Sequence, residues 1–564
     1  MKVFFNDDGS LRPIALALGV NLFFLLVCLL FGEKFVLGHS DDYYMARILE
    51  GVYGETYNVH MPFVNVLYGY ALLPLYYLFP KIGWYYVGEV LAVFISFTTI
   101  SYFIIKRIGI QWGVILSIVL VACFARDFYL TIQFTQCAVA LSAAGMLAFL
   151  DCLNNGLSKK KNIFFAFVLV LWGFCMRSDA FLMGVPFFAC AMLFFMRKAY
   201  DCKYRFGLCV LMLVCGLWGA KYFNDIHYSS PEYVKFSRFQ PYRVMLGDKA
   251  NYDKGSVYDE IEEMGIYRED FSLLTSWYFY DTDVFATDSL KKITNRILKN
   301  TPSVVWSVMP YSFLYRFGNS VAHPCCWVFC LISLALLLKG GKRSFYVLGA
   351  FVVMMAMVGY LIYLSRLLYR VENGLWFYAT VLAVPLLKSF RPLPCRVYYT
   401  ILGSLLIAYM GYFFFTRSYQ HSPSSGRLLE VHRQNTNQNI YKEVFEYMET
   451  FPDNTMFLVP MTVYQSFSQY RSPFYLSDSF GSWKRIVSFG FWTPYFPDVE
   501  NSLRQYGVEN SMRDVVKENV VVISNNEVLL DYLHRHYYEK AEVDTLKNMG
   551  GVKFLKYSKG LQND

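Results

Sequence analysis

The chain is dominated by apolar runs of about twenty residues, separated by short polar segments. Runs of this length predict helices that cross a bilayer. Eleven of them stand out, with boundaries good to a few residues: 13–32, 82–105, 108–125, 128–150, 162–176, 180–196, 206–223, 320–338, 344–364, 374–388 and 397–415. The first run has full spanning length and no small-residue cleavage pattern after it, so we expect a retained helix rather than a signal peptide.

Two further apolar stretches, 62–80 and 303–317, are placed by the charges of the loops. Lys and Arg in short loops stay on the cytoplasmic side. If the N-terminus is inside and neither stretch crosses, five basic loops fall inside: 106–107, 158–161, 197–205, 339–343 and 388–396. Both stretches begin beside a proline and are rich in Tyr and Trp, so we expect juxtamembrane helices on the outer face.

A change in composition near residue 416 divides the chain into two predicted domains. Residues 1–415 form a transmembrane domain with outer loops 33–81 and 224–319, and residues 416–564 form a domain outside the cytoplasm. The predicted fold class is a polytopic α-helical membrane protein of about eleven transmembrane helices plus juxtamembrane helices, with a small C-terminal extracytoplasmic α/β domain.

The α/β prediction for the C-terminal domain rests on four segments. Short apolar runs at 454–461, 518–525 and 552–558 predict buried strands. An amphipathic pattern at 526–540 predicts a helix between the last two of them. Strand, helix and strand in this order indicate a small sheet covered by helices.

Composition supports the membrane class and excludes several functions. Of 564 residues, 55% are hydrophobic and only 17% are charged, against roughly 25% charged in soluble domains. The net charge of +9 does not indicate a nucleic-acid partner, because residues 416–564 carry 16 Lys and Arg against 17 Asp and Glu. The 13 cysteines lie between Cys28 and Cys395 without metal-ligand spacing, so we expect buried hydrophobic side chains and no disulfide framework.

Charged residues recur in every short turn that the topology places outside. Asp41 and Asp42 follow the first predicted span, Arg126 and Asp127 the third, and Arg177 lies beside Asp179 after the fifth. A further turn carries Arg366, Arg370 and Glu372. Ionisable groups at membrane depth are costly, so they are paired, line a polar cavity or mark a substrate path.

These side chains suit phosphate and proton chemistry. An acidic pair near a membrane has raised proton affinity, which makes one carboxylate a general base for a hydroxyl nucleophile. Arg366 and Arg370 are spaced one helical turn apart, so on one helix face they can hold a phosphate or pyrophosphate. A divalent metal, Mg or Mn, is an alternative phosphate ligand, with Asp127 as its candidate side chain. Plain structural ion pairing within each turn is the competing interpretation.

Two segments resemble a known family. "GHSDDYYMARILEG" resembles the first outer loop of the GT-C glycosyltransferases, especially the protein O-mannosyltransferase type, with His39, Ser40, Asp41 and Asp42 at the positions of an "HFDE"-like string. "YNVHMPFVNVLYGYALLPLYYLFP" resembles that family's "VHPPL" segment at His60 and Pro62. The order of acidic loop, non-crossing segment and basic-ended span also agrees.

The resemblance implies a polyprenyl-phosphate-linked sugar donor and a first-loop acid as catalytic base, Asp41 by position with Asp42 beside it. We therefore expect an inverting glycosyltransferase of a bacterial cytoplasmic membrane, acting at the outer face on a glycan, lipid or protein acceptor. The candidates for binding substrate or phosphate are His39, His60, Arg126, Arg177, Arg366 and Arg370. A polymerase or ligase that uses pyrophosphate-linked glycans, and a lipid or solute transporter, are the alternative functions.

Overall fold

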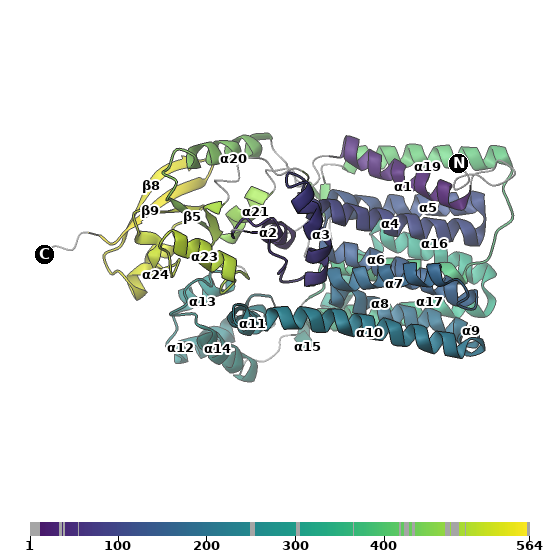
Figure 1. The fold of residues 1–564 in the computed structure, drawn as a ribbon, viewed down its shortest axis with the longest axis horizontal. Helices are drawn as coiled ribbons and strands as arrows, with labels where there is room; N and C mark the ends of the chain where they lie inside the picture. Colours follow the sequence, from purple (N-terminus) through teal and green to yellow (C-terminus); the bar gives the residue numbers. More distant parts are fainter. Residues whose placement is uncertain are drawn as a thin grey trace.

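A computed structural model shows a helical membrane bundle with an α/β domain at one end (Figure 1). It describes residues 12–32, 36–37, 40–54, 56–248, 254–300, 305–364, 366–416, 419–421, 428–430, 435–468, 474, 484–490 and 492–560. Eight helices in these ranges are long and apolar enough to cross a membrane, or nine if one bent pair counts as a span. The protein is thus a multi-pass α-helical membrane protein.

Each of the eleven predicted spans overlaps a helix, although several boundaries differ. Those helices are α1 (Pro13–Phe31), α4 (Trp84–Ile108), α5 (Ile110–Ala125), α6 (Phe134–Asn154), α7 (Lys160–Met176), α8 (Ser178–Met192), α10 (Lys203–Tyr228), α16 (Pro324–Lys339), α17 (Phe345–Tyr363), α18 (Tyr369–Val381) and α19 (Cys395–Thr416). Two of them, α7 with 17 residues and α18 with 13, belong neither to the eight helices that are long and apolar enough to cross a membrane nor to the bent pair.

The short length of α18 has a local cause. The helix ends at Val381, and Pro385 follows in a 3-10 turn; proline cannot continue a helix because it lacks the N–H and clashes with the preceding turn. From Glu372 to Val381 every side chain is buried. The apolar run that predicted a span therefore reflects burial among other helices as well as contact with lipid.

Both stretches predicted to be juxtamembrane form helices that are not separate straight spans. α3 (Val66–Leu78) has 13 residues and runs across the end of the bundle in Figure 1. α15 (Val305–Val321) meets α16 at a bend of 77° at His323. The prediction that neither stretch adds a crossing therefore agrees with the helix geometry.

α6 lies at the centre of the bundle, and 94% of its most apolar stretch is buried. It packs closely against α7 because small residues line the contact. A Cβ atom on Gly173 of α7 would lie 2.9 Å from the Ala138 carbonyl oxygen of α6, and one on Gly145 would lie 2.8 Å from the Val170 backbone nitrogen. Small side chains allow such close approach between membrane helices. By contrast, α10 and α19 are mostly exposed on the outside of the bundle.

Four outer helices connect the bundle to the α/β domain. They are α11 (Val234–Arg243), α12 (Lys254–Glu263), α13 (Arg268–Thr275) and α14 (Thr287–Asn300). The buried carboxylate of Asp281 accepts hydrogen bonds from the hydroxyls of Tyr532 and Tyr537, each at 2.6 Å, and from Asn510 Nδ2 at 2.9 Å. Because unpaired buried charge is costly, these bonds bind the outer loop firmly to the domain.

The C-terminal domain is built on a five-stranded mixed sheet in the order β6-β5-β7-β9-β8. β5 (Met456–Val459), β7 (Val520–Ser524) and β9 (Val552–Ser558) lie in the predicted strand segments, and α24 (Leu529–His536) lies in the predicted helix. β6 (Ile486–Ser488) and β8 (Glu542–Met549) were not predicted. β8 is an edge strand with mostly exposed polar side chains, so it lacks an apolar signal.

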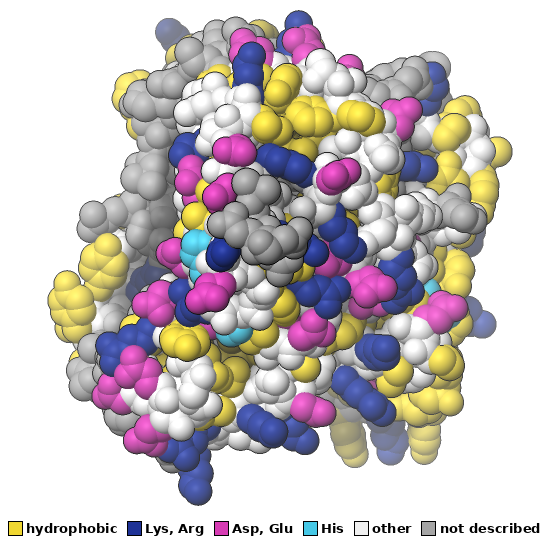
Figure 2. All heavy atoms as spheres, turned by 90° about the vertical axis from the view of Figure 1, so that its left-hand side faces the viewer, with side chains coloured by type: hydrophobic (Ala, Val, Ile, Leu, Met, Phe, Trp, Pro, Cys, Tyr) yellow, Lys and Arg dark blue, Asp and Glu magenta, His cyan; other side chains and the backbone are white. Residues whose placement is uncertain are grey.

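The surface of this domain away from the bundle carries interspersed acidic and basic side chains (Figure 2). This mixture agrees with the near balance of 16 basic and 17 acidic residues in 416–564. Such a surface is typical of a face in contact with water.

Gly173→Ala is expected to destabilise the protein by about 1–3 kcal/mol, because the added methyl group overpacks the contact between α6 and α7. Thermal unfolding of the purified protein in detergent measures the change. Gly216→Ala in α10 is the matched control: no atom lies within 4 Å of its added Cβ, and alanine favours the helix. Equal melting temperatures for wild type and Gly173→Ala would contradict the packing described for α7.

Candidate functional site

The acidic pair lies on a short helix between the bundle and the α/β domain. α2 (Ser40–Leu49) begins with Asp41 and Asp42 in its first turn, where the helix dipole favours negative charge. Asp41 Oδ1 accepts a hydrogen bond of 3.2 Å from Trp492 Nε1 of the α/β domain. A carboxylate from the first outer loop and an indole from the last domain thus meet at this helix end.

The two aspartates have different surroundings. Asp42 is fully buried, and its Oδ1 accepts hydrogen bonds from the Tyr85 hydroxyl at 3.1 Å and from the Phe134 backbone N–H at 3.0 Å. These donors belong to α4 and α6, so Asp42 fastens α2 to the bundle. Asp41, by contrast, faces the junction with the α/β domain.

Three arginines gather near this pair. Arg177, in the turn between α7 and α8, and Arg370, in the first turn of α18, both have Asp41, Asp42 and Arg366 among their strongest electrostatic neighbours. Arg177 Nη1 donates to Thr135 Oγ1 at 3.2 Å. Five of the residues singled out in the sequence thus come together from three distant segments. Asp179 joins them as the strongest charged neighbour of Arg177, so three guanidinium groups lie with three carboxylates.

The expected helical spacing of Arg366 and Arg370 is wrong. α18 begins at Tyr369, and Arg366 lies before it in a non-helical segment. The carbonyl of Arg366 accepts a hydrogen bond from the Leu368 N–H at 2.9 Å. The two guanidinium groups nevertheless remain electrostatic neighbours. Tertiary folding, rather than a shared helix face, brings them together.

Arg126 and Asp127 form a separate group on the other side of the start of α18. They belong to a π-helical turn, η1 (Arg126–Leu130), and both are buried. Asp127 Oδ2 accepts from the Tyr369 hydroxyl at 2.7 Å and from Asn373 Nδ2 at 3.3 Å. Tyr369 thus contacts Asp127, while its neighbour Arg370 faces Asp41. Arg126 is an electrostatic neighbour of Tyr412 in α19.

Of the two predicted histidines, only His60 lies among the described residues, and it belongs to a different contact. His39 lies outside the described residues. His60 stacks on Tyr233 with ring centroids 4.0 Å apart, and its Nδ1 bonds to Asn58 Oδ1 at 2.8 Å. Asn58 also donates to Asp498 Oδ2 of the α/β domain at 2.7 Å. His60 therefore belongs to a polar contact that joins the first outer loop to α11 and the domain.

Two residues of the junction were missed in the sequence. Glu89 of α4 is fully buried and is an electrostatic neighbour of Asp42. The sequence could have indicated Glu89, because it is the single acidic residue of the predicted span 82–105 and an acid inside a span is unusual. Trp492 lies in the segment 480–496, where several aromatic residues occur together and no local pattern distinguishes Trp492 from the others.

Trp492 is held by α11 and by aromatic packing. Gln240 Nε2 donates to the Trp492 carbonyl at 2.8 Å, and Arg243 Nε donates to Gln240 Oε1 at 2.8 Å. The Trp492 ring packs edge-on against Tyr44 at 5.4 Å and Phe63 at 5.5 Å. These contacts fix the indole N–H beside Asp41.

A metal centre is not assembled by the part of the chain that the structure describes. No group of three or more His, Cys, Asp or Glu side chains there is arranged to hold a metal ion. Asp127 has hydroxyl and amide donors on its Oδ2 rather than further carboxylates. Its donor set therefore does not fit the predicted Mg or Mn site.

Comparisons with known proteins leave the family open. Neither protein families nor curated proteins give a sequence match to the chain. Among solved structures, the chain is similar to the crystal structure of ArnT from Cupriavidus metallidurans bound to undecaprenyl phosphate. The TM-score is 0.42 at 11% identity, over 98% of this chain and 99% of that chain. At this degree of similarity we draw no functional conclusion from it.

His60 generates a pH prediction. Burial, and then repulsion from His227, lowers the pKa of His60 from 6.5 to about 4. The folded state thus binds its proton more weakly than the unfolded chain, so stability is lost as pH falls from about 6.5 toward 4. Because His60 is partly exposed, solvent screening weakens the effect. We expect the free energy of unfolding to fall by about 1–2 kcal/mol between pH 7 and 4.5.

Melting temperatures at pH 7 and pH 4.5 for wild type and His60→Gln measure this effect. The difference between the two pH values should shrink in His60→Gln, whatever the variant's absolute stability. His227→Gln should give an intermediate difference, because burial still acts on His60. An unchanged difference in His60→Gln would mean that other groups cause the acid sensitivity.

Proposed function

We propose that the chain transfers a sugar from a polyprenyl-phosphate donor to an acceptor hydroxyl at the end of the bundle that carries the α/β domain. One observation carries the proposal: Asp41 lies at a membrane-proximal junction beside Arg177, Arg366 and Arg370. A general base next to several guanidinium groups is what attack by a hydroxyl and departure of a phosphate require. The sequence resemblance of the first outer loop supports the same chemistry.

In the proposed reaction, Asp41 accepts the proton of the acceptor hydroxyl as its oxygen attacks the anomeric carbon. The bond between that carbon and the phosphate oxygen breaks, and polyprenyl phosphate leaves with the electron pair. Attack opposite to the leaving group inverts the anomeric configuration. The carboxylate gains a proton and the leaving phosphate gains negative charge, so the step is balanced.

The arginines act on the leaving group. Guanidinium groups form charge-assisted, often bidentate hydrogen bonds with phosphate. Arg370 and Arg366 approach from the start of α18 and Arg177 from the turn before α8, so a phosphate between them meets cations from two sides. Removal of water by the covering α/β domain strengthens these interactions.

Trp492 and Asp42 position the base. The indole N–H holds one oxygen of Asp41, and Asp42 fixes the first turn of α2 through Tyr85 and Phe134. Geometry held in this way makes proton transfer more efficient. The α/β domain thus contributes to the site through Trp492 as well as covering it.

Asp41→Asn is expected to lower sugar transfer by about 100- to 10,000-fold, because the amide cannot accept the proton. Membranes that contain the full chain, supplied with radiolabelled polyprenyl-phosphate sugars, provide the assay. Glu269→Gln, which removes an exposed acid on α13, is the matched control and should keep wild-type activity. Full activity of Asp41→Asn, at equal expression, would assign Asp41 to structural pairing.

Arg370→Gln is expected to lower kcat/KM for the donor by about 10- to 100-fold, the usual size of a lost charge-assisted hydrogen bond. Arg370→Lys should recover part of the loss, since it keeps the charge without the planar fork. The exposed Arg238 of α11 supplies the control variant, Arg238→Gln. Transfer from pyrophosphate-linked glycans but from no monophosphate donor would favour a polymerase or ligase instead.

A further inference from the structure

The opposite end of the bundle combines an apolar groove with a group of cations. α4 runs from one end of the bundle to the other. Just before its start, the Gly83 N–H bonds to the Phe474 carbonyl of the C-terminal domain. Its last turn, at the opposite end, carries Lys106 and Arg107. Arg107 Nε donates to the Leu387 carbonyl at 2.9 Å. The end of α16 and the start of α17 meet at this same end, beside the segment after α18.

The groove lies between α16 and α17 and has a volume of about 470 Å³. Its walls are aliphatic and aromatic, formed mainly by Phe329, Leu337, Phe345, Leu348 and Phe351. Phe345 is 70% exposed, and Leu337 and Leu348 are 61% and 62% exposed. Such walls suit a hydrocarbon chain rather than water.

Three cations lie in the segment that joins α16 to α17 at the end of this groove. Lys339 ends α16 with its Nζ 4.1 Å from the centre of the Phe390 ring. Lys342 and Arg343 follow in η4 (Gly341–Ser344), whose first and last residues line the groove. Arg343 Nη1 donates to the Leu386 carbonyl at 3.3 Å, which brings the basic segment 388–396 beside them.

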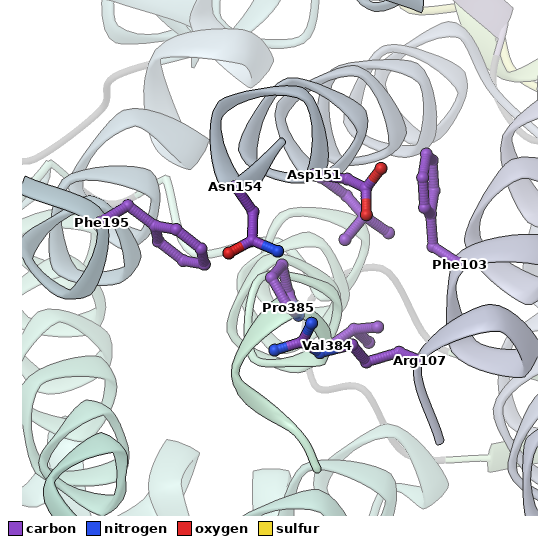
Figure 3. A pocket seen from close by; sticks show the side chains of 8 residues that line it. Phe103, Arg107, Asp151, Asn154, Phe195, Val384 and Pro385 are labelled. Carbon is purple, nitrogen blue, oxygen red and sulfur yellow. The ribbon is translucent and has the colours of Figure 1, made fainter. Parts of the chain in front are cut away.

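Negative charge that could balance these cations is scarce. The sequence has no Asp or Glu in residues 289–371 or 373–429. The nearest acid on α6, Asp151, is already paired with Lys106 at 2.8 Å. Figure 3 shows Asp151 and Arg107 beside a cavity of only about 10 Å³, and Arg107 is itself an electrostatic neighbour of Arg343.

We propose that this groove and its cations bind one anionic diacyl phospholipid of the surrounding leaflet. The acyl chain lies along Leu348 and Phe351, and the phosphate contacts Lys339 and Lys342. Charge complementarity selects the occupant: cations next to a membrane-facing apolar groove attract an anionic headgroup, at about fivefold in affinity for each lysine. This site is distinct from the proposed reaction site at the other end of the bundle.

A second basic loop at the predicted inner face provides an internal comparison. Residues 158–161 contain Lys159, Lys160 and Lys161, all exposed, at the start of α7. These lysines line neither the groove between α16 and α17 nor the small cavity beside Asp151. General attraction of basic loops to an anionic membrane acts on both loops equally, whereas a specific lipid site requires the groove.

The test is native mass spectrometry of the full chain extracted from vesicles of phosphatidylglycerol and phosphatidylcholine in equal amounts. Wild type should retain one phosphatidylglycerol in clear preference. K339Q together with K342Q should lower that retention by about 10- to 30-fold, while K160Q together with K161Q should leave it unchanged. L348W should also lower retention, because the larger ring fills the groove without changing the charge.

Melting temperature in lipid-free detergent serves as the folding check, and all variants should match wild type there. The proposal is overturned if K160Q with K161Q loses as much lipid as K339Q with K342Q, or if phosphatidylcholine is retained equally. Stabilisation by inorganic phosphate alone, as large as that by phosphatidylglycerol, would assign the cations to a free anion and also overturn it. Sugar transfer is not part of the readout, so the result is independent of the proposed function.

Discussion

The arrangement of this protein depends on the burial of charged side chains on one short helix. α2 carries Asp42 and Arg47, and Glu50 follows its last residue. All three side chains are nearly inaccessible to solvent. Arg47 and Glu50 pair at 3.0 Å, and Arg47 also lies over the Tyr43 ring at 4.8 Å. Buried charges are tolerated only with partners, so the helix has to be enclosed on both sides. The bundle supplies one side and the α/β domain the other.

Aromatic packing completes this enclosure. Tyr44 of α2 stacks on Tyr464 of the domain with ring centroids 4.1 Å apart, and the hydroxyls of Tyr53 and Tyr464 share a hydrogen bond of 2.5 Å. Buried aromatic pairs add about 0.5–1.5 kcal/mol beyond their area. The contact between the two domains is therefore part of the core, and the proposed site exists only where both are assembled.

The two ends of the bundle differ in what their charges do. At the end with the α/β domain, cations and carboxylates lie together under a protein cover, an arrangement suited to chemistry on an anionic substrate. At the other end, cations lie beside exposed apolar side chains and the acids are few, an arrangement suited to the lipid surface.

Sequence reasoning located the helices well because membrane spans need about twenty apolar residues, a local property. It was less accurate for α18, whose apolar run reflects burial and whose end is set by Pro385. It also missed the edge strand β8, since exposed polar strands leave no apolar pattern. Elements whose character comes from their neighbours cannot be identified from local periodicity.

For the candidate site, the sequence by itself determined which charged residues are anomalous for a membrane protein, among them Asp41, Arg177 and Arg370. Only the tertiary structure decided which of them meet. It grouped these three, moved Arg126 and His60 into other contacts, and brought in Trp492 from 451 positions away. The physical reason is that the cost of a charge in a membrane is visible residue by residue, whereas its partner is chosen by packing between distant segments.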